Sequence, residues 1–99
     1  MPRERADEEF RSLLTRPGLR IERIVSTGQI SPDWYDQEED EWVLLIEGSA
    51  HLLVEGEDEL VLGPGDHLLI AAHVRHRVTR TDPDRPTIWL AVHFDAPAE

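Results

Sequence analysis

The chain has 99 residues, of which 39% are hydrophobic, and its Asp+Glu count of 21 against Lys+Arg of 10 gives a formal net charge of -11. This length and composition predict a single globular domain with one modest core. So acidic a chain lacks the basic surface that phosphate groups require, which argues against nucleic acid as a partner. The sequence has no cysteine and no lysine, so disulfides, thiolate metal sites and Schiff-base chemistry are excluded.

The chain also lacks the apolar segments that direct proteins to membranes. Its longest apolar run covers residues 42–46, far short of a membrane-spanning helix. No apolar stretch follows the charged residues at positions 1–5, so the sequence predicts no signal peptide. We therefore expect a cytoplasmic protein with no membrane partner.

Residues 7–16 are predicted to form one short N-terminal helix. Asp7 can cap it, and the acidic residues that follow suit the positive end of a helix dipole. Pro17-Gly18 then ends the segment. The apolar side chains fall at the i, i+3, i+4 spacing of one helix face: Phe10, Leu13 and Leu14.

Beyond residue 18 the apolar residues alternate with period two, which predicts β-strands. Short runs separated by Gly- and Pro-rich turns are typical of an all-β antiparallel sandwich or small barrel. We expect one domain over residues 1–99, with a helical segment at 1–18, a barrel at 19–94 and a tail at 95–99. The predicted strands are 19–25 with a bulge near Arg23, 42–46, Ala50–Val54, Leu60–Leu62, 68–72, 75–81 and 87–94.

The strand at residues 42–46 is apolar on both faces. A barrel this small can cover only one of these faces with its own core, and the stripe of the predicted helix is narrow. Because an exposed apolar patch of that size favours association, we expect a homodimer.

Polar residues gather at the heads of two predicted strands. The acidic stretch 36–41 runs directly into the apolar run at 42–46, and His73 and His76 follow the later apolar run at 68–72. Carboxylate at the head of one strand and imidazole at the head of another are the donors that a divalent-metal pocket inside a barrel needs.

These residues resemble the two halves of the cupin signature. Glu41 is followed after six residues by Gly48, and Gly65-Asp66 is followed by a strand that leads to His76. The resemblance covers roughly residues 30–80. It implies a jelly-roll barrel, and it implies that Glu41 and His76 are metal ligands at one end of that barrel.

The sequence departs from the cupin pattern at several positions. The two histidines of the first half fall on Tyr35 and Gln37 if three residues precede the glutamate, or on Trp34 and Asp36 if four do. Neither pair is histidine. In the second half the usual proline, glycine and asparagine fall on Ala71, His73 and Arg80.

Two interpretations therefore stay open: a metal site weakened by the loss of two ligands, and a purely structural role for these residues. The oxygen-rich donor set suits Mn, Fe(II) or Zn. In the alternative, Glu41 only ends a strand and His76 is a hydrogen-bonded barrel histidine. The candidate metal ligands are Glu41, His76, Gln37, Asp36 and His73.

Other polar and aromatic residues have two interpretations each. His93 is a ligand or base if its face of the last strand lines the pocket, and an interface residue otherwise, which is the interpretation we favour. Trp34 and Tyr35 can wall a pocket mouth, whereas we assign Trp42 to core filling.

Three functional hypotheses follow. The first is a small cupin-domain protein with a divalent-metal site and an unassigned activity. The second is a metal-dependent enzyme that acts on a small acid or a sugar-like substrate. The third is a non-catalytic module that binds a small molecule or serves only as a structural dimer. Fold alone does not choose among them, because function resides in the site.

Overall fold

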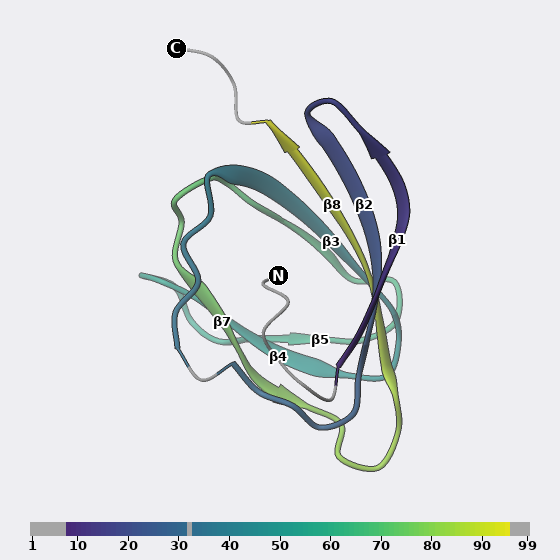
Figure 1. Ribbon diagram of the computed structural model, residues 1–99. Coiled ribbons are helices and arrows are strands. Elements are labelled where there is room, and N and C mark those ends of the chain that lie inside the picture. The colour runs from purple at the N-terminus through teal and green to yellow at the C-terminus, as the bar shows by residue number, and fades with distance from the viewer. Residues whose placement is uncertain (1–7, 32, 96–99) are drawn as a thin grey trace.

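The computed structural model describes residues 8–31 and 33–95, and it shows two antiparallel sheets packed face to face (Figure 1). The larger sheet has five strands in the order β1-β2-β8-β3-β6, and the smaller has three in the order β5-β4-β7. This is the expected all-β jelly roll. The strands are β1 (Glu9–Arg16), β2 (Leu19–Ser26), β3 (Glu39–Glu47), β4 (Ala50–Val54), β5 (Leu60–Leu62), β6 (His67–Ile70), β7 (His76–Thr81) and β8 (Thr87–Asp95).

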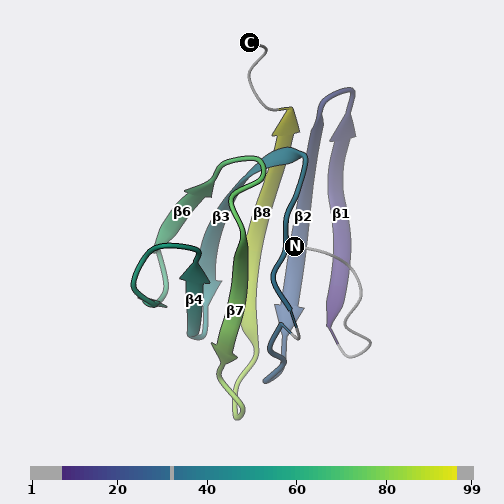
Figure 2. The same ribbon diagram turned by 90° about the vertical axis from the view of Figure 1, so that its left-hand side faces the viewer.

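The predicted N-terminal helix is wrong. Glu9–Arg16 is strand β1, paired antiparallel with β2 from Glu9↔Val25 to Arg16↔Leu19 (Figure 2). The register shifts between Ser12 and Leu14, and this bulge explains why the apolar spacing imitated a helical stripe. Pro17-Gly18 forms the hairpin turn, where Gly18 has a φ of 72°, as the third position of a type II turn requires. Asp7 lies outside the described residues.

The bulge expected near Arg23 is absent from β2, which pairs with β8 in continuous register. Glu22, Ile24 and Ser26 are buried, so these residues face the interior and the alternation of β2 is unbroken. The alternation was hard to follow in the sequence because the outward Ile21 and Val25 are apolar, whereas the inward Glu22 and Ser26 are polar.

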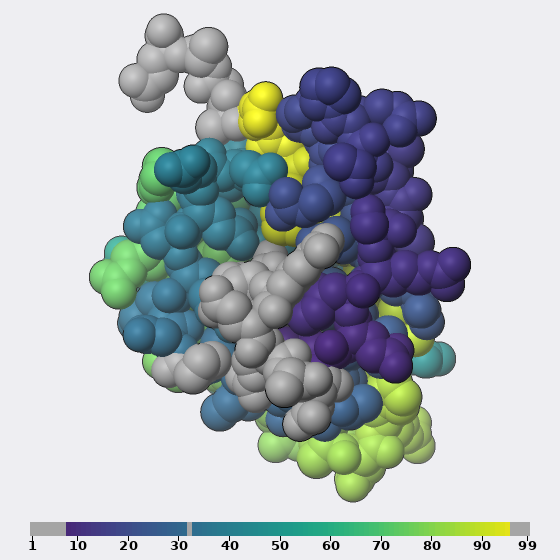
Figure 3. Space-filling model, viewed as in Figure 1, coloured from purple at the N-terminus to yellow at the C-terminus, as the bar shows by residue number. Residues whose placement is uncertain are grey.

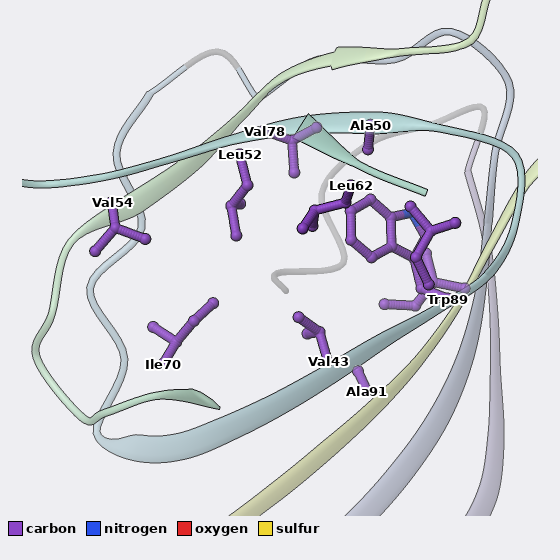
Figure 4. Packing of buried hydrophobic residues seen from close by; sticks show 11 residues of the cluster. Val43, Ala50, Leu52, Val54, Leu62, Ile70, Val78, Trp89 and Ala91 are labelled. Atoms are coloured by element: carbon purple, nitrogen blue, oxygen red, sulfur yellow. The ribbon is translucent and has the colours of Figure 1, made fainter. Parts of the chain in front are cut away.

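The core lies between the two sheets. Val43 and Ile70 point from the larger sheet toward Leu52, Val54 and Val78 of the smaller one (Figure 4). Trp89 is only 1% exposed and packs in the same cluster. Trp42, assigned to core filling from sequence, instead lies half-buried on the outer face of β3, with its ring centroid 5.7 Å from that of His67.

Two hydrogen bonds join the head of β3 to the segment between β6 and β7. The Ala72 amide donates to Asp40 Oδ1 at 2.7 Å, and the His73 amide donates to the Gln37 carbonyl oxygen at 2.7 Å. The chain on either side of these bonds contains Glu41 and His76. These hydrogen bonds therefore fix the segment that contains Glu41 and the segment that leads to His76 relative to each other.

The β1–β2 hairpin, purple to dark blue, forms one flank of the molecule in the space-filling view (Figure 3). It extends the larger sheet beyond β8. The described residues include no helical segment with the length and apolarity needed to cross a membrane.

Candidate functional site

Glu41 and His76 meet inside the barrel, as the sequence predicted. Both side chains are 0% exposed, and His76 Nε2 lies 3.7 Å from Glu41 Oε1. His76 Nδ1 is 3.1 Å from the carbonyl oxygen of Val74. Because a carbonyl oxygen only accepts hydrogen bonds, Nδ1 carries the proton and Nε2 presents its lone pair. Within the described part of the chain, His76 Nε2 has no hydrogen-bond partner.

Gln37 belongs to the same group. Its Nε2 donates a hydrogen bond to Glu41 Oε1 at 3.0 Å. Tyr35 pairs with His76 through backbone hydrogen bonds, and their rings are in edge contact with centroids 5.8 Å apart. Of the two alignments left open by the sequence, the geometry therefore favours the one that puts Tyr35 and Gln37 at the motif histidine positions.

Asp36 and His73 are not in this buried group. His73 Nδ1 lies 2.8 Å from Asp36 Oδ1, and the two side chains are 67% and 52% exposed respectively. His73 has a φ of 65°, which turns the chain between β6 and β7 and directs its ring to solvent. The structure brings this pair together, but away from the interior that Glu41 and His76 share.

His93 faces the interior, so its favoured assignment as an interface residue is wrong. It is 1% exposed, and its Nε2 lies 3.8 Å from Glu41 Oε2. Strand pairing explains the contact, because His93 and Glu41 are direct cross-strand partners in β8 and β3. Each carboxylate oxygen of Glu41 thus faces one imidazole nitrogen.

Glu22 is the interior residue that the sequence analysis missed. Its side chain is 0% exposed, and its Oε1 lies 3.5 Å from His93 Nε2 and 3.4 Å from Arg20 Nε. The available signal was alternation, since Glu22 is two residues before the buried Ile24 on the same face of β2.

Burial and charge act in opposite directions on these groups. Burial lowers the pKa of His76 below its ordinary value of 6.5, because the charged imidazolium is disfavoured out of water. Burial alone would raise the pKa of Glu41, but nearby positive charge holds this pKa below its ordinary value. The site therefore favours a carboxylate beside a neutral imidazole, which are the forms that bind metals.

The donors fit a metal ion in type and in pairwise spacing. Ligand bonds of about 2.0 to 2.2 Å place donors roughly 3 to 4.5 Å apart, and the distances from Glu41 to His76 and His93 fall in that range at 3.7 and 3.8 Å. Among residues 8–31 and 33–95, however, no group of three or more His, Asp or Glu side chains has an arrangement that could hold a metal ion.

A surface groove of about 410 Å³ lies elsewhere. It is lined by the β3–β4 turn and the loop between β7 and β8, including Glu47, Ser49 and Arg85. None of the buried polar residues lines it. We place the chemistry in the barrel interior, because that is where titratable side chains converge with shifted pKa values.

Comparison with known proteins agrees with this fold. The cupin domain family model matches residues 22–93, and the chain therefore belongs to the cupin family. A protein from Ralstonia eutropha JMP134, provisionally named as a mannose-6-phosphate isomerase, is 53% identical over 96% of this chain and 91% of its own, with a TM-score of 0.89. No curated protein matches the sequence.

More distant structures share the fold alone. A cupin superfamily protein from Desulfitobacterium hafniense DCB-2 is 16% identical over 96% of this chain and 84% of its own, with a TM-score of 0.77. The iron(II) form of the protein HppE is 19% identical over 88% of this chain and 50% of its own, with a TM-score of 0.73.

Proposed function

We propose that this cupin binds one divalent metal ion inside its barrel, with Glu41 and His76 as ligands and Gln37 beside them. The observation that carries the proposal is His76 Nε2, which is buried, lacks a hydrogen-bond partner within the described part of the chain, and faces Glu41 Oε1 at 3.7 Å. A buried nitrogen lone pair left without a donor costs free energy, and a metal ion would satisfy it.

Mn, Fe(II) and Zn are the candidate ions, because carboxylate and amide oxygens with imidazole nitrogen suit these metals. Related folds support the assignment, since HppE has been observed with iron(II) and with cobalt(II). A metal held here would act as a Lewis acid on a carbonyl or hydroxyl oxygen. The chain's own contribution is a water-excluding interior that holds Glu41 ionised.

Metal analysis of protein purified without a His-tag tests the proposal. We expect close to one equivalent of Mn, Fe or Zn per chain, and loss of binding in both His76→Ala and Glu41→Gln. Circular dichroism should show that both variants keep the β-sheet signal. Parent-like metal binding by both variants would refute the assignment of the site.

A sugar-phosphate isomerase is a second candidate, favoured by the name of the 53% identical protein from Ralstonia eutropha. Aldose–ketose isomerisation requires a group that moves a proton between adjacent carbons, and the buried carboxylates beside imidazoles have that chemistry. Incubation with mannose 6-phosphate, monitored by NMR, should then yield the ketose. The Glu41→Gln variant should not convert the substrate. No conversion by the metal-loaded parent would exclude this substrate.

A further inference from the structure

The surface groove lies at the opposite end of the barrel from Glu41 and His76. His76 begins β7 and Glu41 lies near the start of β3, whereas the groove of about 410 Å³ forms where these two strands end. Figure 2 shows this end at the bottom of the view, with the β7–β8 loop. Small-molecule pockets typically measure roughly 300 to 1,000 Å³. The groove is therefore large enough for a small ligand that does not touch the buried polar residues.

Hydrogen bonds hold together the three loops that form the groove. The Asp82 amide donates to the Ser49 carbonyl oxygen at 3.2 Å, and Thr87 Oγ1 donates to the same oxygen at 3.1 Å. These bonds join the β7–β8 loop to the β3–β4 turn. The turn between β5 and β6 is joined to β3, because the Gly65 amide donates to the Leu45 carbonyl oxygen at 2.8 Å. The groove is thus formed before a ligand arrives, which lowers the entropy cost of binding.

Side chains of both charges line this groove. Arg85 comes from the β7–β8 loop, and Glu47 is the last residue of β3. Within residues 8–31 and 33–95, neither of these two side chains takes part in a hydrogen bond or an ion pair. Asp82 also lines the groove and accepts the Asp84 amide at 2.8 Å, but a carboxylate can accept several donors at once. The groove therefore offers a cationic and an anionic contact to the same ligand.

We propose that the groove binds a small zwitterion of the α-amino-acid type. The ligand's carboxylate pairs with Arg85, and its ammonium group pairs with the carboxylates of Glu47 and Asp82. Such charge-assisted hydrogen bonds are roughly twice as strong as neutral ones. Pro64 and Pro86 supply rigid apolar walls for a short side chain. The metal site proposed above plays no part in this binding, so either proposal can fail without the other.

Charge distinguishes a zwitterion from a simple anion as the ligand. The groove has one positive side chain against two negative ones, and the whole chain has a net charge of -11. This field repels an anion that has no positive group. An ammonium group on the ligand turns the repulsion into attraction. The amino group should therefore be required for binding, and added salt should weaken binding by screening the charges.

NMR titration of the nitrogen-15-labelled full chain with L-alanine tests the proposal. We expect saturable shifts of the Gly48 and Ser49 amides, which line the groove, and no shift of the Gly18 amide in the β1–β2 hairpin at the other end of β8. L-lactate lacks the ammonium group and isopropylamine lacks the carboxylate. Each should bind at least about 10-fold more weakly than L-alanine, because a hydrogen bond to a charged group contributes that factor or more. No saturable response to L-alanine, or equal affinity for either analogue, would overturn the proposal.

Substitutions at the two unpaired charges test where the zwitterion binds. Arg85→Gln and Glu47→Gln should each weaken L-alanine binding by about 10-fold or more, and both side chains are exposed, so the fold should persist. The matched controls are Arg16→Gln and Glu57→Gln, which make the same changes at exposed positions outside the groove. Both controls should bind L-alanine like the parent. Parent-like binding by both groove variants would refute the proposal.

Discussion

The side chain of His76 is oriented by one backbone carbonyl. Val74 accepts the Nδ1 proton at 3.1 Å, which leaves Nε2 directed at Glu41. Burial lowers the pKa of His76 from 6.5, so the folded chain keeps this imidazole neutral at pH values where the unfolded chain protonates it. Neutral imidazole is the form that a metal requires.

This pKa shift predicts acid sensitivity of the metal-free protein. As the pH falls through the ordinary pKa of 6.5, the unfolded chain gains a proton that the folded chain resists, so the free energy of unfolding decreases. Melting temperatures measured between pH 7 and pH 5 should fall for the parent. His76→Gln, which cannot titrate there, should show a shallower decline, and an equal slope in the two proteins would contradict the explanation.

Sequence reasoning located Glu41, Gln37 and His76, but it missed Glu22 and favoured an interface role for His93, and the reason is physical. Alternation reveals that a strand has two faces without telling which face is inside. In β8 the outward residues Ile88, Leu90 and Val92 are more uniformly apolar than the inward ones, because the barrel interior must accommodate a polar site. Choosing the more apolar face of β8 as the buried one therefore placed His93 on the outside, although it faces the interior.

At the scale of elements, the segment joining β6 to β7 is held against the head of β3 by Asp40. This carboxylate is 7% exposed and accepts the Ala72 amide at 2.7 Å. Asp40→Ala leaves that buried amide without its acceptor, which should cost about 1–3 kcal/mol. Asp40→Asn keeps an acceptor oxygen and should cost much less in chemical denaturation. Equal losses in the two variants would contradict this role.

The β3–β4 turn depends on Gly48. Its φ is 93°, and a Cβ there would lie 2.7 Å from the Pro86 carbonyl oxygen and 2.6 Å from Thr87 Oγ1. Gly56 is the matched control, with a φ of 84° and no atom within 4 Å of its Cβ position. Gly56→Ala should cost about 1–2 kcal/mol from backbone conformation alone, and Gly48→Ala clearly more. Equal costs in denaturant titrations would show that the turn can relax.

Strand β1 shows where element prediction fails. The spacing of Phe10, Leu13 and Leu14 fits a helix, yet Phe10 packs against the core while Leu13 is 50% exposed at the bulge. Pairing with β2 along most of the segment overrides the local pattern, as tertiary contacts often do. No signal within residues 9–16 alone reveals that partner, whereas strands such as Ala50–Val54 carry clean alternation and were predicted with the observed bounds.

At the scale of the whole molecule, an apolar row crosses the outer face of the larger sheet from edge to edge. One row of paired residues crosses every strand of that sheet: Leu14, Ile21, Val92, Trp42 and Leu69. Only apolar side chains occupy this row, and Leu69 is 56% exposed. A surface of this kind favours association.

We propose that a second copy of the chain covers this face. The net charge of -11 opposes contact between two copies through acidic surfaces, whereas this face places Arg11 and Arg23 side by side. Sedimentation should show a species of twice the 11.4 kDa chain mass. Leu90→Glu should dissociate it, while Val61→Glu, at a 68% exposed position of the smaller sheet, should not. A monomeric parent at micromolar concentration would exclude the dimer.

Anomalous diffraction from crystals of the full chain grown with Co²⁺, recorded at the cobalt absorption edge, tests the central claim most directly. The account predicts one strong peak inside the barrel, within about 2.0 to 2.2 Å of imidazole nitrogen and carboxylate oxygen, bonded to His76 and Glu41. An empty barrel, or a peak only at the exposed Asp36–His73 pair, would contradict it.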